Sequence, residues 1–262
     1  MMICPICHHV LMREMNSYTC IHKHSFDIAK SGYVNLWPGN HKGSGDDKEM
    51  VKARTMFLNT GHYQLFQQTL IDLVKRANPS VLADVGCGEG YYTNALKQSL
   101  EACEVYGFDV SKSALQHASR QNAKIHYIIA SLADLPLSDE SIDVITDVFA
   151  PVDAKSFHRV LKPGGQLIKA GPGRQHLLEM KQVLYEKVYE NDDGIIAYDG
   201  FEHMERIVKT QQSELTSNPE IQSLFQMTPY YWKSPKQTAD VLKAMEHLTV
   251  QTQFCFDVYK RK

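Results

Sequence analysis

The stretch that most constrains the fold of this chain runs from Val81 to Tyr92 and reads VLADVGCGEGYY. A short apolar run ends in an acidic residue and opens into a turn with glycines at positions 86, 88 and 90. An apolar strand followed by a glycine-rich turn and a helix is the first half of a nucleotide-binding α/β unit. The stretch therefore predicts a cofactor site at the carboxyl end of a buried strand.

The spacing of the glycines indicates the kind of cofactor. Dinucleotide-binding turns read G-x-G-x-x-G and bring a pyrophosphate to a helix N-terminus, whereas this turn reads D-x-G-x-G-x-G. S-adenosylmethionine has no phosphate, and an acidic residue before the first glycine can meet the ammonium of its amino-acid tail. The spacing favours S-adenosylmethionine, with Asp84, Gly86 and Gly88 as binding residues. Asp109 ends the next apolar run, where a carboxylate accepts hydrogen bonds from a ribose diol.

Apolar runs alternate with helical patterns along most of the chain. This alternation predicts a parallel, doubly wound sheet, so we expect a Rossmann-like class I methyltransferase fold with a mostly parallel, seven-stranded sheet. We expect helices over 48–58, 63–77, 91–100, 111–122 and 153–161, and a long amphipathic helix from 173 to about 190. We expect strands over 80–85, 104–110, 125–131, 142–149 and 166–170, and two later strands, 206–215 and 250–259, that pair at one edge.

Cysteines and histidines crowd into the first twenty-four residues. Cys4-Pro-Ile-Cys7 is followed by Cys20-Ile-His-Lys-His24, and two ligand pairs separated by a short hairpin suit one tetrahedral zinc ion. We take Cys4, Cys7, Cys20 and His24 as the ligands. His22 competes with His24 for the fourth position.

The composition of the chain suggests where its domains meet. Residues 1–37 form the predicted zinc-binding module, to which the segment FDIAKSGYVNL (26–36) is assigned. Residues 38–47 are rich in Gly and charge and poor in apolar side chains, which is typical of a linker. Residues 48–262 form the predicted S-adenosylmethionine-dependent methyltransferase domain.

Charge and hydropathy limit the possible partners. With 28 Lys and Arg against 30 Asp and Glu, no whole-protein field favours a polyanion, so a nucleic-acid role needs a local basic face. No apolar run reaches the ~20 residues that span a bilayer, and the N-terminus lacks a signal-peptide pattern; we therefore expect a cytoplasmic protein without membrane contact. The basic residues that can contact phosphates, if they share a face, are Arg13, Lys23, Lys30, Lys42, Lys52 and Arg54 in the N-terminal part and Lys260, Arg261 and Lys262 at the basic end.

The residues that would assist catalysis are not singled out by the sequence. Methyl transfer depends above all on alignment, and the carboxylates or imidazoles near predicted strand ends are Asp147, His176 and Glu179. Strand alternation can turn Asp147 away from the site. Phe149, in the run VFAP, either stacks on a flat acceptor or packs in the core.

Together these motifs resemble the zinc-bearing large-subunit (23S) ribosomal RNA guanine-N1 methyltransferases. The likeness rests on CPIC, CxxxH, FDIAKSGYVNL, GHY, DVGCGEGYYT, FDVSK, FAP, LKPGG, PGRQHLLEM and QMTPYYW, and overall similarity is closest to the Gram-negative type. It implies methylation of guanine N1 in a 23S ribosomal RNA hairpin, a homodimer, and approach of the target base near Trp232. It also implies that the cofactor site is lined by Tyr63, Tyr92, Thr93, Asp109 and His176. The rival interpretations are a quinone- or sterol-type small-molecule methyltransferase and a non-catalytic zinc-containing RNA-binding protein.

Overall fold

A single large sheet organises the part of the chain that the computed structural model describes, residues 1–39, 41 and 45–262. Within these residues the sheet has eight strands. In order across the sheet they are β10 (Phe201–Leu215), β11 (Leu248–Arg261), β9 (Leu161–Pro172), β8 (Ile142–Val148), β5 (Val81–Val85), β6 (Glu104–Asp109), β7 (His126–Ile129) and β4 (Val34–Asn35).

The sheet is mostly parallel, as predicted. Only β11 runs against its neighbours, β9 and β10, while the remaining pairs are parallel. The seven expected strands are β5 to β11, and the two late ones pair at the sheet edge. The eighth strand, β4, comes from the segment 26–36, which was expected to form a strand-turn-strand in the zinc-binding module: Val34 and Asn35 instead pair with Ile128 and Ile129 on β7.

The helices begin and end close to their predicted positions, with one exception. The α-helices are α1 (Lys48–Leu58), α2 (Gln64–Ala77), α3 (Tyr91–Ser99), α4 (Lys112–Gln121), α5 (Ala154–Val160), α6 (Leu178–Leu184), α7 (Asn218–Gln226), α8 (Tyr230–Lys233) and α9 (Lys236–Lys243), and a short 3-10 helix, η1, spans Leu132–Asp134. Side-chain caps fix the starts of three described α-helices, α1, α4 and α5; at α5, Asp153 accepts from Ser156 N at 2.9 Å. Asp47 accepts a hydrogen bond from Met50 N at 2.9 Å, and Ser111 Oγ accepts one from Ala114 N at 3.1 Å, which satisfies N–H groups that have no partner inside a helix.

The exception is the long helix predicted from 173 to about 190. The helix α6 is only Leu178–Leu184, because the chain then folds back toward its own start. Lys181 Nζ donates to the carbonyl of Tyr189 at 3.0 Å and to Asn191 Oδ1 at 2.7 Å, and Asn191 N donates to the Arg174 carbonyl at 2.9 Å. A buried ammonium needs such acceptors, and the folded-back segment provides them.

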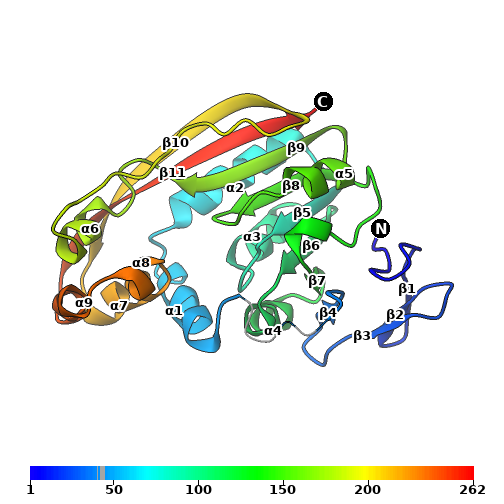
Figure 1. Ribbon diagram of the computed structural model, residues 1–262, viewed down its shortest axis with the longest axis horizontal. Helices are drawn as coiled ribbons and strands as arrows, with labels where there is room; N and C mark the ends of the chain where they lie inside the picture. Colours follow the sequence, from blue (N-terminus) through cyan, green and yellow to red (C-terminus); the bar gives the residue numbers. More distant parts are fainter. Residues whose placement is uncertain (40, 42–44) are drawn as a thin grey trace.

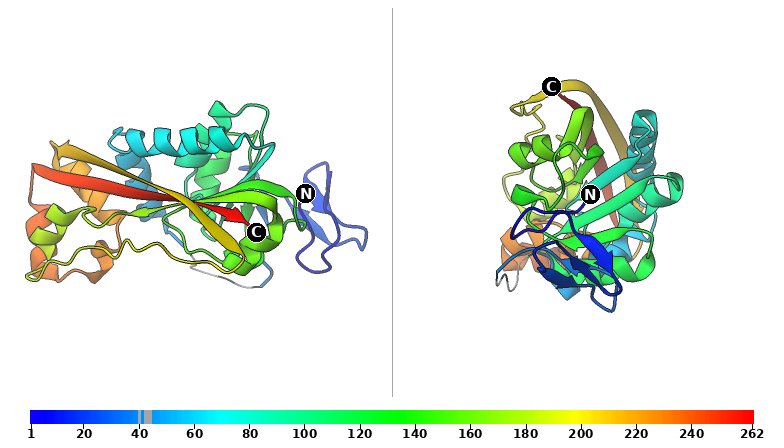
Figure 2. Two further views of the ribbon diagram at one scale, coloured as in Figure 1. Left: turned by 90° about the horizontal axis from the view of Figure 1, so that it is seen from above. Right: turned by 90° about the vertical axis from the view of Figure 1, so that its right-hand side faces the viewer.

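The two faces of the sheet are covered differently. Helices α2, α3 and α4 pack on one face in a cluster that includes Phe66, Leu96 and Leu115. Helix α5 and the N-terminal module cover the other, where Cys4 and Phe157 share a cluster with β5 and β6. Figure 2 (left) shows α2 and α5 on opposite sides of the sheet, with the N-terminal module at one end.

The N-terminal module is a small antiparallel sheet of β1 (Met12–Glu14), β2 (Ser17–Thr19) and β3 (Ser25–Asp27). It docks through a bridge between Met2 and Leu137 and a contact of 3.4 Å between Tyr18 Oη and His126 Nδ1. The segment 26–36 is therefore divided: its first residues complete β3, whereas Val34 and Asn35 belong to the large sheet. Of the predicted linker 38–47, residues 40 and 42–44 lie outside the described residues.

None of the described helices is both long and apolar enough to cross a membrane.

Candidate active site and metal centre

The glycine turn after β5 adopts backbone conformations that exclude other residues at two positions. Gly86 has φ +67°, and a Cβ there would lie 2.5 Å from Ala150 Cβ. Gly90 has φ +86°, and a Cβ there would lie 2.7 Å from the Tyr127 hydroxyl. A Cβ fits neither position without a shift, so glycine at 86 and 90 lets the turn pack closely against Ala150 and Tyr127.

Asp84 lies beneath this turn and is only 2% exposed. Its carboxylate accepts hydrogen bonds from Thr93 Oγ1 at 2.5 Å and Thr146 Oγ1 at 2.7 Å. Burial raises the pKa of Asp84 to about 6, and the two hydroxyls oppose this shift. Thr93, expected at the cofactor, therefore donates a hydrogen bond to the Asp84 carboxylate in this structure.

Asp109 ends β6 directly beside the turn. Its carboxylate accepts from Gly88 N at 2.9 Å and from Ser111 N at 2.7 Å, so it ties the turn to the start of α4. Burial raises the pKa of Asp109, although these two hydrogen bonds act to lower it. A carboxylate offers about four acceptor positions, which leaves lone pairs for ribose hydroxyls.

Two charged residues that were not predicted at the cofactor complete this site, although Arg54 was expected to contact phosphates. Arg54 on α1 pairs with Asp46 and lies 3.7 Å from Glu89 in the glycine turn. Burial raises the pKa of Glu89 to about 7, although the nearby Arg54 lowers it. Glu89 could have been suspected from its position inside the motif, whereas Arg54 shows no signal beyond its charge.

Unpartnered polar atoms support a cofactor at this place. Among the described residues, buried Glu89 Oε2 and Tyr92 Oη have no hydrogen-bond partner. Buried polar groups are normally bonded, and a zwitterionic ligand with ribose hydroxyls supplies both donors and acceptors. The residues present therefore fit S-adenosylmethionine.

An aromatic cluster lies at the ends of β8 and β9, around Phe254 in the middle of β11. The ring of Phe254 is 5.1 Å from that of Tyr63, 5.4 Å from that of His176 and 4.9 Å from that of Phe149. Phe149 is 46% exposed and has φ +60°, a conformation that costs a bulky residue energy and is often found at functional sites. It is therefore not a core aromatic.

The three groups considered for catalysis lie in different surroundings. His176 is buried near the aromatic cluster, and its Nδ1 accepts from Gln253 N at 3.2 Å; burial lowers its pKa to about 3, so the imidazole is neutral. Glu179 accepts from Gln251 N at 2.8 Å. The side chain of Asp147 lies on the opposite face of β8 from Thr146, which shares its face with Asp84. Asp147 Oδ1 lies 3.3 Å from Lys169 Nζ.

The run Met227 to Trp232 divides between core and surface. Tyr230 is buried, and Lys181 Nζ lies 5.8 Å from its ring centroid. Trp232 is 65% exposed and is free to meet a ligand.

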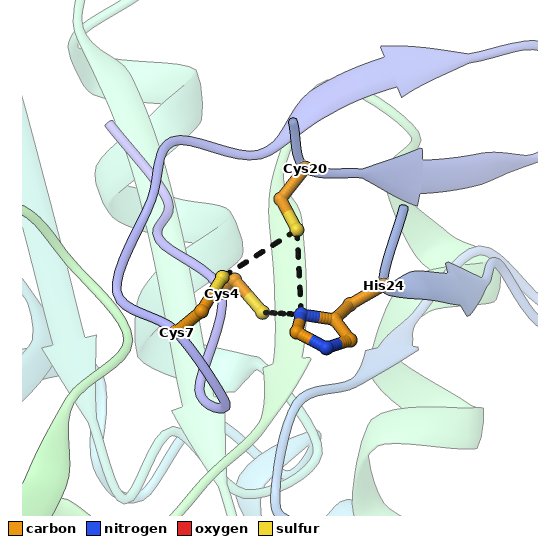
Figure 3. Close-up of side chains that lie close together, drawn as sticks. All are labelled: Cys4, Cys7, Cys20 and His24. Carbon is orange, nitrogen blue, oxygen red and sulfur yellow. Dashed lines mark hydrogen bonds between the residues drawn. The ribbon is translucent and has the colours of Figure 1, made fainter. Parts of the chain in front are cut away.

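The four predicted zinc ligands converge in the N-terminal module. His24 Nδ1 lies 3.5 Å from both Cys4 Sγ and Cys20 Sγ, and Cys7 Sγ lies 3.6 Å from Cys20 Sγ (Figure 3). These donor atoms all lie within 4.8 Å of one another. Three thiols and one imidazole are a usual donor set for structural zinc. His22 instead groups with Cys7 and His9, so His24 completes the main cluster.

Comparisons with known proteins match both the N-terminal and the cofactor-binding parts of the chain. Residues 2–45 match a zinc-ribbon family model described as "RlmA, N-terminal", and residues 82–165 match a model described as "Methyltransferase domain". A putative 23S rRNA (guanine-N(1)-)-methyltransferase of Micromonospora griseorubida is 31% identical over 94% of this chain and 92% of its own length. The chain belongs to the 23S rRNA guanine-N1 methyltransferase family.

Other comparisons agree with this family. The 23S rRNA (guanine(748)-N(1))-methyltransferase of Streptomyces fradiae is 31% identical over 78% of this chain and 75% of its own length. A solved structure from work on conversion of a disulfide bond into a thioacetal group during echinomycin biosynthesis has a TM-score of 0.50. It is 14% identical and covers 74% of this chain and 81% of its own, so it supports the fold alone.

Membership of the guanine-N1 methyltransferase family confirms the resemblance seen in the sequence. The chain is a class I, S-adenosylmethionine-dependent methyltransferase with an N-terminal zinc ribbon. S-adenosylmethionine and zinc are accordingly its cofactor and its structural metal.

Proposed function

We propose that this enzyme transfers a methyl group from S-adenosylmethionine to N1 of one guanine in a hairpin of 23S ribosomal RNA. The observation that carries the proposal is the combination, in one chain, of the zinc cluster and the D-x-G-x-G-x-G site. The substrate named for the relatives is 23S ribosomal RNA. A small-molecule methyltransferase has no need of the zinc ribbon.

We propose roles for the cofactor-site residues from their surroundings. S-adenosylmethionine supplies a methyl group on a positively charged sulfur. Asp84 holds the ammonium of the amino-acid tail, Asp109 accepts from the ribose hydroxyls, and the tail lies beside the glycine turn at Gly86 and Gly88. Tyr63, Tyr92, Thr93 and His176 complete the lining.

The acceptor base needs alignment more than a strong base. Phe149 stands exposed at the end of β8, next to the aromatic cluster, and is placed to stack on a flat purine. Stacking of a base on an aromatic ring contributes ~1 to 3 kcal/mol. Positioning of reacting groups supplies a large share of the rate enhancement in such transfers. Phe149 positions the acceptor base.

We propose a separate role for each of the three predicted segments of the chain. Residues 1–37 help to recognise the RNA hairpin, residues 38–47 connect the two domains, and residues 48–262 hold the cofactor.

We also propose a homodimer, supported by the exposed outer strand β10, where Met204 and Val208 are about half exposed. Unpaired strand edges readily associate with a second chain. Sedimentation analysis at several concentrations tests this.

The central experiment incubates the protein and labelled S-adenosylmethionine with an unmodified 23S ribosomal RNA transcript. Nuclease mapping and mass spectrometry then locate the label, which we expect at N1 of a single guanine. RNA that already carries the methyl group is the control and should accept none. Absence of label from the transcript would refute the proposal. The position also separates the Gram-negative type from relatives that modify a neighbouring guanine.

A further inference from the structure

A groove runs between α1 and α4, outside the cofactor site. Its volume is about 610 Å³, and residues from both helices line it. Lys48, Lys52 and Thr55 of α1 face Ser113, Gln116 and Arg120 of α4 across the groove. Residues spaced by three or four share one helical face, so each helix presents polar side chains to the groove, and Val51 and Met56 of α1 form apolar parts of its lining.

Three cations of this groove form no ion pair with the described residues. No carboxylate of the described residues lies within ion-pair distance of Lys48, Lys52 or Arg120, and all three side chains are exposed. Arg54, only two residues beyond Lys52, points the other way and pairs with Asp46 and Glu89. Helix α1 therefore has a paired inner cation and unpaired outer ones.

Two neutral polar residues of the groove, Ser113 and Gln116, can contact the same kind of ligand as its cations. In the part of the chain that the structure describes, the side chains of Ser113 and Gln116 make no hydrogen bond. Hydroxyl and amide groups beside Lys and Arg are the usual contacts to phosphate and sugar. No carboxylate lines the groove, so its charge complements a polyanion even though the whole chain has a net charge of −2.

The position of the groove connects it to both functional sites. Arg54 of α1 reaches the glycine turn, and α4 begins directly after Asp109 and Ser111. In Figure 1, α1 and α4 lie between the zinc-binding module at one end of the molecule and α7 to α9 at the other. A strand of RNA in this groove would run alongside the cofactor site.

We propose that the α1–α4 groove binds the phosphate backbone of the ribosomal RNA substrate through Lys48, Lys52 and Arg120. This inference rests on the proposed function and adds a binding surface to it. It also selects among the basic residues of the N-terminal part, since Lys52 contacts phosphate whereas Arg54 holds α1 to the glycine turn.

The test compares a groove variant, Lys48→Gln/Lys52→Gln, with a matched control, Lys75→Gln/Lys155→Gln. The control lysines are exposed, lie on α2 and α5 and form no ion pair with the described residues. Affinity for the unmodified 23S transcript is measured at several salt concentrations. Each lost phosphate contact lowers the slope of log K against log salt by about 0.7 to 0.9, so the groove variant should lose about 1.4 to 1.8 and Arg120→Gln about half of that.

Cofactor affinity by calorimetry separates the possible failures. The groove variants should bind S-adenosylmethionine as tightly as the wild type, while the control keeps the wild-type salt slope. Equal slopes for groove variant and control would overturn the groove proposal, as would loss of cofactor affinity in the groove variant. If wild-type protein neither binds nor methylates the transcript, the proposed function itself fails.

Discussion

Asp84 shows how one residue can lower the stability of a fold while serving its site. Its carboxylate is buried, and the hydroxyls of Thr93 and Thr146 compensate only part of the lost hydration, because the pKa is still raised to about 6. A raised pKa means that the neutral form is favoured in the folded protein. Stability from this group is therefore complete below pH ~4 and is lost as pH rises through about 6.

Replacing Asp84 by Asn tests this directly. Above pH 6 the cofactor-free variant should be more stable than the wild type by about 1 to 3 kcal/mol, because a shift of two pKa units corresponds to ~3 kcal/mol. The difference should vanish near pH 4, as measured by urea unfolding. Glu89 and Asp147 titrate in both proteins, so the comparison cancels them.

The same variant should bind the cofactor poorly. At pH 8 the loss of the carboxylate should weaken S-adenosylmethionine at least tenfold in calorimetry, which corresponds to about 1.4 kcal/mol. At pH 5 the wild-type carboxylate is largely protonated, so the two affinities should approach each other. Equal affinity at pH 8 would show that the ammonium is held elsewhere.

On the side of the acceptor base, Phe149 is the residue whose role follows most clearly from the fold. Phe149→Ala should lower kcat/KM for the RNA by about 5- to 150-fold, the equivalent of ~1 to 3 kcal/mol of stacking, with cofactor affinity unchanged. Phe149→Tyr should retain most activity, because it keeps the ring. A loss shared equally by both variants would contradict stacking.

Sequence reasoning identified the kinds of residue in the site better than the directions in which they point. The zinc ligands and the glycine turn were predictable because their spacing along the chain fixes their geometry. The partners of Arg54 and Thr93 were not, since each contacts a carboxylate through tertiary packing. Charge and hydroxyl chemistry are visible in a sequence, but the partner of a side chain depends on the fold around it.

At the scale of elements, helix and strand positions were predictable wherever local signals were strong. Caps at Asp47 and Ser111 mark the starts of α1 and α4 in the sequence. The end of α6 at Leu184 was not predictable, because the amphipathic pattern continues while buried Lys181 draws residues 189–191 back onto the helix. The strand β4 is only two residues long and depends entirely on pairing with β7.

Replacing Lys181 by Met tests what holds the folded-back segment. The change leaves the Tyr189 carbonyl and Asn191 Oδ1 without their donor, and hydrogen bonds to charged groups contribute ~1.5 to 3 kcal/mol each. Removal of the buried ammonium offsets part of this loss, so we expect the free energy of unfolding to fall by about 1 to 3 kcal/mol. Amide exchange should speed up in residues 185–191. The exposed Lys187→Met is the control, and unchanged exchange in Lys181→Met would contradict the role.

At the scale of the whole molecule, the zinc ribbon is part of the sheet's outer layer. Cys4 and Cys20 lie in the same apolar cluster as Ala83 and Tyr106, on the face opposite α2, α3 and α4. The cofactor turn is held from the other direction, by Arg54 of α1 and by Asp109. Zinc and cofactor are therefore bound by separate contacts on one scaffold.

This arrangement predicts that loss of zinc separates the two functions. Cys4→Ser/Cys7→Ser should lose its zinc by elemental analysis, because two of four ligands are gone, and zinc supplies much of the folding free energy of such small modules. Methylation of the 23S transcript should fall at least 100-fold, an order-of-magnitude expectation for loss of a recognition module. S-adenosylmethionine affinity should change less than about threefold, or ~0.7 kcal/mol.

The matched control for this variant is Cys103→Ser. Cys103 is buried, as Cys4 is, but lies outside the zinc cluster, and its thiol donates to the Glu104 carbonyl, a bond that a hydroxyl can replace. It should keep one zinc ion and full methylation. Parallel loss of cofactor affinity in Cys4→Ser/Cys7→Ser would mean that the ribbon and the sheet fold as one unit, since undocking at Met2 and Leu137 would then disturb β5 and β6. Full methylation without zinc would instead exclude the ribbon from RNA recognition.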